Sequence, residues 1–79
     1  MLRPAKHSHP DQSIVYLSSV LARHLRRRRV ESYSGLLDLA RRSVGGAEDL
    51  FAPTLSLLFG LGLIEYRRKA DSFEYVGAG

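Results

Sequence analysis

Residues 50–75 carry the pattern that most constrains the fold of this chain. Leucine and phenylalanine occur at helical density up to position 61, and Gly62 then ends the run. Residues 63–67 and 73–76 alternate apolar and polar side chains and are rich in aromatic and β-branched residues, which predicts two strands. A short polar turn at residues 68–72 joins them. This segment therefore predicts a helix followed by a β-hairpin.

A first helix is predicted from about residue 13 to residue 27, after an extended N-terminal arm at residues 1–12. Asp11 or Ser13 is suited to cap its start. Its apolar side chains recur at helical spacing and predict one core face: Ile14, Leu17, Leu21 and Leu25.

A second helix is predicted after a short strand at residues 30–31, with Ser32 as its N-cap. Its apolar face is expected to be formed by Tyr33, Leu36, Leu37, Ala40 and Val44. Gly45 and Gly46 are expected to end it, because a left-handed residue commonly terminates a helix.

The third helix is predicted to start near residues 48–50 and to end near Gly60. This start places Pro53 in the first turn, where its missing N–H has no partner to lose. The core face expected of this helix comprises Leu50, Phe51, Leu55, Leu57, Leu58 and Leu61. The order of elements predicts an α+β fold. We expect residues 13–79 to form a winged helix-turn-helix domain, with three helices packed on a small antiparallel β-hairpin at the C-terminus.

The composition is that of one small globular domain. The chain has 79 residues, of which 44% are hydrophobic and 25% charged. It has no cysteine and no apolar signal-peptide run, which favours a cytoplasmic location. Its longest apolar stretch, residues 50–64, falls short of the ~20 residues that cross a bilayer. A core of this size rarely supplies more than ~3–5 kcal/mol, so we expect marginal stability without a partner.

The third helix lacks the side chains of a DNA reader. No lysine or arginine occurs from residue 43 to residue 66, although base edges are read by Arg, Lys, Asn or Gln. The helix face opposite the core carries acidic or small residues: Asp49, Ala52, Ser56 and Gly60. These residues are either solvent-facing fillers or a protein-docking groove, and base-specific readout is the least favoured interpretation.

The first helix carries a second apolar stripe. Tyr16, Val20 and His24 follow one another at intervals of four residues, away from the leucine face. Exposed apolar patches often mark partner surfaces. Two interpretations stay open for this stripe: it contacts a partner protein, or the N-terminal arm folds over it.

The formal net charge of +4 is concentrated in clusters. One is the run Arg26, Arg27, Arg28 and Arg29; another is Arg67, Arg68 and Lys69 at the expected hairpin tip. The run can be a solvated helix end favoured by the helix dipole. Alternatively, both clusters contact phosphates or an acidic protein surface, which predicts weak, sequence-blind DNA binding at most.

Catalytic and cofactor sites are not predicted. His7, His9 and Asp11 are three metal-binding side chains on an arm without a fourth ligand, which makes a poor metal site. The sequence offers no nucleophile–base arrangement and no glycine-rich phosphate loop. We expect a protein that is not an enzyme and needs no cofactor, metal or small-molecule substrate.

The chain resembles the sixth middle-component family of bacterial ABC three-component systems, which overlap with Lamassu-type defence loci. One part of the resemblance is the opening Pro4-Ala5-Lys6-His7, followed by Pro10 and Ser13. The other is a C-terminal pattern formed by Phe51, Leu55, Leu58, Phe59, Leu61, Gly62, Leu63, Ile64 and Glu65. The arginine run and the Gly45-Gly46 loop depart from the family pattern.

This resemblance implies a non-enzymatic accessory subunit of a bacterial anti-phage or anti-plasmid complex. The implied partners are an SMC-like ABC ATPase and an effector, often a nuclease, of the same operon. From the residues themselves, the rival interpretation is a small DNA-binding regulator that uses the hairpin tip and the arginine run.

Overall fold

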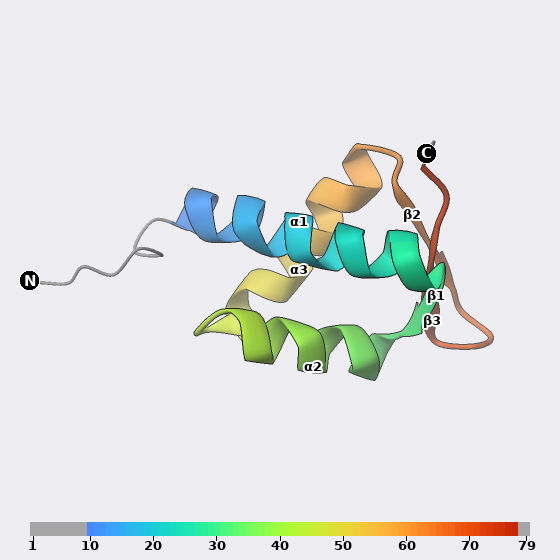
Figure 1. The fold of residues 1–79 in the computed structure, drawn as a ribbon, viewed down its shortest axis with the longest axis horizontal. Helices are drawn as coiled ribbons and strands as arrows, with labels where there is room; N and C mark the ends of the chain where they lie inside the picture. The colour runs from blue at the N-terminus through green and yellow to red at the C-terminus, as the bar shows by residue number, and fades with distance from the viewer. Residues whose placement is uncertain (1–9, 78–79) are drawn as a thin grey trace, which may run out of the picture.

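The computed structural model describes residues 10–77, which form three helices and one antiparallel sheet (Figure 1). The elements are α1 (Pro10–Arg28), β1 (Val30–Ser32), α2 (Tyr33–Ser43), α3 (Ala47–Gly60), β2 (Ile64–Arg67) and β3 (Ser72–Tyr75). The sheet lies at one end of the helices, where α1 ends and α2 begins, and the α2–α3 turn lies at the opposite end (Figure 1). The predicted α+β fold is confirmed, and its arrangement is winged-helix-like.

The sheet joins the predicted hairpin to the short strand that follows α1. Its strand order is β1-β3-β2, and both outer strands run antiparallel to β3. Tyr66 on β2 lies opposite Phe73 on β3, and Val30 on β1 lies opposite Glu74. The two strands and their turn at residues 68–71 confirm the predicted β-hairpin.

The core is formed by the predicted leucine face of α1 packed against α2, α3 and the sheet. Its buried hydrophobic side chains are Leu17, Leu21, Leu25, Leu36, Ala40, Val44, Ala47, Phe51, Leu55, Leu58, Ile64, Phe73 and Tyr75. The prediction was wrong for Leu61, which is the C-cap of α3 and is 61% exposed, although its N–H still donates to the carbonyl of Leu57. Thr54, which was not predicted to be in the core, is fully buried.

Both ends of the loop between α2 and α3 differ from the prediction. The second helix ends at Ser43, and Val44 already has an extended backbone. Gly46 has the left-handed conformation, with φ of 70°, but it directly precedes α3 and does not terminate α2. The left-handed conformation of the glycine was therefore predicted correctly. The prediction that this glycine ends α2 was wrong, because it precedes α3.

Helix α3 begins earlier than predicted, at Ala47, so Pro53 is not in its first turn. A proline at this position donates no N–H to the carbonyl of Asp49, and the helix continues past it. The C-terminal end agrees with the prediction. Gly62 has φ of 73° and donates to the carbonyl of Phe59, while Leu63 donates to that of Leu58. These two bonds form a Schellman motif, which a left-handed glycine favours.

Helix α1 begins at Pro10, three residues before the predicted start, in agreement with the preference of proline for the first turn. Ser13 therefore lies inside the helix, where it is buried and does not cap it. The first nine residues, which include most of the predicted arm with His7 and His9, lie outside the described residues. None of the described helices is long and apolar enough to cross a membrane.

Candidate docking surfaces

The stripe predicted on α1 borders a surface pocket between α1 and α2. Tyr16 is 44% exposed, whereas Val20 and His24 are half-buried. The pocket has a volume of about 170 Å³ and is lined by Val20, Arg23, His24, Arg27 and Leu39. Part of the predicted docking stripe and one arginine of the basic run therefore meet in a single hollow, a combination that the sequence analysis did not foresee.

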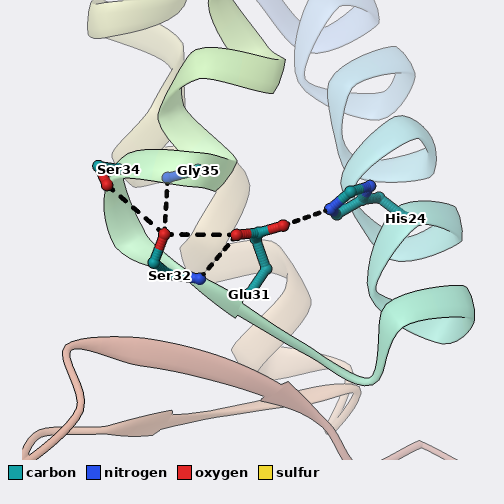
Figure 2. Close-up of polar contacts among 5 residues, drawn as sticks. All are labelled: His24, Glu31, Ser32, Ser34 and Gly35. Atoms are coloured by element: carbon teal, nitrogen blue, oxygen red, sulfur yellow. Dashed lines mark hydrogen bonds and ion pairs between the residues drawn. The ribbon is translucent and has the colours of Figure 1, made fainter.

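His24 is held in place by a polar network that connects α1 to the start of α2 (Figure 2). Its Nε2 lies 2.8 Å from Glu31 Oε1. The other carboxylate oxygen of Glu31 accepts a hydrogen bond of 3.0 Å from the Ser32 backbone N–H and one of 3.3 Å from the Ser32 hydroxyl. Ser32 Oγ in turn accepts from the Gly35 N–H at 3.0 Å, which confirms Ser32 as the predicted N-cap of α2.

The network depends on the absence of a side chain at position 35. A Cβ atom there would lie 2.9 Å from Ser32 Oγ and 2.7 Å from Glu31 Cδ, which is closer than real Cβ contacts. Glycine thus leaves room for a carboxylate at the N-terminus of α2, where the helix dipole favours negative charge. The hydrogen bond with His24 is the main cause that lowers the pKa of Glu31, and desolvation opposes it.

The face predicted on α3 is solvent-exposed along its whole length: Asp49, Ala52, Ser56 and Gly60 are all exposed. Phe59 lies three residues after Ser56, so the two side chains are neighbours on the helix surface. The Phe59 ring is itself 42% exposed. The small-residue stripe therefore ends beside a large apolar ring. A partner backbone can approach the small residues closely, and the ring provides apolar contact area.

An aromatic cluster adjoins the C-terminal half of α3. The buried Phe73 ring has its centroid 6.1 Å from Phe59, 5.9 Å from Tyr33 and 5.1 Å from Tyr66. These three outer rings remain between 39% and 42% exposed. The sequence analysis missed this cluster, although Tyr66 and Phe73 stand at facing positions of the predicted hairpin. Aromatic side chains are enriched among the residues that dominate binding energy at interfaces.

The hairpin cations differ in their partners. Arg67 is ion-paired with Glu74, to which its Nε donates at 2.7 Å, and lies near Glu65. Arg68 and Lys69 are exposed in the turn and form no ion pair with any described residue. Only these two of the three predicted cations are therefore available to an acidic ligand.

The arginine run spans the end of α1. Arg26, Arg27 and Arg28 form the last turn, as the dipole argument expects. Arg29 lies outside the helix with φ of 71°, and its guanidinium stacks over the Tyr75 ring at 5.6 Å. Arg29 lies outside the helix because the chain turns there to enter β1.

Comparison with known protein families shows the family to which this chain belongs. The family model of ABC-three component (ABC-3C) system Middle Component 8 matches residues 29–76, which is more than half of the chain. The chain belongs to this family. The resemblance to ABC three-component middle components is therefore confirmed, with component 8 in place of the sixth. No curated protein and no solved structure gives a significant match.

The matched range includes one half of the sequence resemblance and not the other. It contains α2, α3, the hairpin and the pattern from Phe51 to Glu65. The opening at Pro4 to His7 and all of α1 lie before it. Membership in the Middle Component 8 family thus rests on the segment that carries the α3 face and the aromatic cluster.

Proposed function

We propose that this chain is a non-enzymatic docking subunit that joins an SMC-like ABC ATPase, an effector nuclease or both in a bacterial anti-phage or anti-plasmid complex. The observation that carries the proposal is the exposed, cation-free face of α3 within a member of the ABC-3C Middle Component 8 family. We place the protein in the cytoplasm with the other components of the same operon.

The α3 face is suited to protein contact for two physical reasons. Ala52, Ser56 and Gly60 have no long side chain, so a partner helix or strand can approach the α3 backbone closely. Phe59 and the neighbouring aromatic cluster supply apolar area that loses contact with water when a partner covers it. Asp49 in the first turn forms no ion pair with a described residue, so its carboxylate repels a phosphate backbone, whereas Glu48 beside it is ion-paired with Arg41.

The test is co-purification of the tagged chain with the ATPase and effector encoded beside it. Ser56→Arg puts a long cation into the middle of the α3 face and is expected to abolish co-purification while the domain stays folded. Ala70→Arg is the matched control, because Ala70 is exposed in the hairpin turn and belongs to neither α1 nor α3. If assembly is unchanged by Ser56→Arg, the α3 face is not the docking surface. If the unmodified chain retains neither protein, the proposed function is wrong.

A second candidate function is DNA contact through the hairpin tip. Arg68 and Lys69 are exposed there without an ion-pair partner among the described residues. Two such cations predict weak binding to random duplex that is lost between about 50 mM and about 200 mM salt. Nanomolar selectivity for one DNA sequence would favour a DNA-binding regulator over a docking subunit.

A further inference from the structure

The α1–α2 pocket has room for one large side chain. Its volume of about 170 Å³ is close to that of a cavity of ~150 Å³ that binds benzene. Val20 from α1 and Leu39 from α2 give it apolar walls, and both are only half-buried. A leucine or phenylalanine side chain from another protein segment matches this size and these walls.

The same pocket is positively charged. Arg23 and Arg27 stand four residues apart on α1, so their guanidinium groups lie on one face of the helix. Neither forms an ion pair with a described residue. The nearby carboxylate of Glu31 is already engaged by His24 and Ser32. The two arginines therefore lack a counter-charge among the described residues. A guanidinium binds a carboxylate in a two-point geometry.

Combining size and charge, we propose that this pocket binds a segment of a partner protein in which one large apolar side chain is flanked by aspartate or glutamate. A nucleic-acid backbone would satisfy the arginines but leave Val20 and Leu39 without an apolar partner, so the chemistry favours a peptide. The inference rests on the proposed function and adds the kind of segment that the other component supplies.

The first test measures affinity between the full chain and its co-purifying component. The double variant Arg23→Glu/Arg27→Glu is expected to weaken binding by more than about tenfold, because it places carboxylates against carboxylates. Arg23→Lys/Arg27→Lys retains the charge and should retain most of the affinity. Arg42→Glu, compared with Arg23→Glu alone, changes the net charge equally at an exposed site that does not line the pocket, and should have little effect.

The second test identifies the occupant by cross-linking within the assembled complex. A photoreactive benzoylphenylalanine replaces Arg23, which is exposed at the pocket, while Arg27 remains. We expect a cross-link to a peptide of another component that contains an apolar residue with acidic neighbours. A cross-link to residues 1–9 of the same chain, to a second copy, to nucleic acid or to a peptide without carboxylates overturns the inference.

The outcomes separate the inference from the function on which it depends. If the complex forms and the charge reversal does not weaken it, the pocket is not the binding site and the docking function stands. If no component binds the unmodified chain, both the function and the inference are wrong.

Discussion

His24 on α1 and Glu31 on β1 are joined by a contact of 2.8 Å between Nε2 and Oε1, across seven residues that include the end of the helix (Figure 2). The contact fixes the direction in which the chain leaves α1. Because Glu31 also accepts from Ser32, which caps α2, one carboxylate connects the end of the first helix to the start of the second. The same contact holds His24 at the wall of the α1–α2 pocket.

Replacing Glu31 with glutamine should destabilise the domain by about 1 kcal/mol at neutral pH, because a charged hydrogen-bond acceptor is lost. The pKa of Glu31 in the folded protein is lowered below its ordinary value of 4.5, chiefly by the hydrogen bond with His24. The stabilisation is therefore fully present above that value and lost as the pH falls through the lowered pKa. Chemical denaturation should show a difference between the two proteins at about pH 5 that shrinks towards about pH 3. A difference that is independent of pH would contradict this assignment.

Gly35→Ala should have a small net effect that conceals two opposing ones. Alanine favours a helix over glycine by up to about 1 kcal/mol, but its Cβ would displace the Glu31 carboxylate from Ser32. In a Glu31→Ala background the clash with the carboxylate is absent and only the approach of 2.9 Å to Ser32 Oγ remains, so the same substitution should be more favourable there than in the unmodified protein. A double-mutant cycle on the free energy of unfolding measures this coupling. Additive effects would show that Gly35 is not required by the carboxylate.

Thr54→Val should raise the free energy of unfolding by about 1 kcal/mol. Thr54 is fully buried in α3, and its Oγ1 has no hydrogen-bond partner among the described residues. Valine has the same shape and removes the cost of an unsatisfied buried hydroxyl. The melting temperature and urea midpoint of the two proteins provide the measurement. A loss of stability would mean that the hydroxyl has a partner in solution.

Leu58→Ala and Val20→Ser should separate core from interface. Leu58 is 1% exposed, so its truncation should cost about 2–5 kcal/mol and unfold a domain of this size. Val20 is half-buried at the α1–α2 pocket, so its replacement should affect the free domain little and weaken the complex. Thermal melting of the free domain and affinity for the partner give the two readouts. If both variants unfold the free domain, Val20 belongs to the core.

Local patterns in the sequence were sufficient to predict most of the secondary structure. Ser32 was recognisable as a cap, Gly62 as a helix terminator and the hairpin as alternating strands, because each depends on neighbours within a few residues. The leucine face of α1 followed from helical spacing. These features required no knowledge of tertiary contacts.

Features that depend on contacts between distant elements were not predictable. The exposure of Leu61 depends on where α3 ends. The left-handed backbone conformation of Arg29 depends on how the chain enters β1. The aromatic cluster around Phe73 and the pairing of His24 with Glu31 require the packed sheet and helices. The candidate residues on α1 and α3 were proposed from helix faces alone, whereas Leu39 and Arg23 became part of a site only through packing.

We propose that this member of the ABC-3C Middle Component 8 family acts by docking other proteins. The test is light scattering coupled to size-exclusion chromatography, applied at physiological salt to the full chain mixed with the two proteins that we propose as its partners, an ATPase and an effector. We expect a stable complex of defined mass that contains this chain, together with a higher melting temperature of the chain in the complex. The docking function would be contradicted if the chain eluted separately from both proteins and instead bound one DNA sequence with nanomolar affinity.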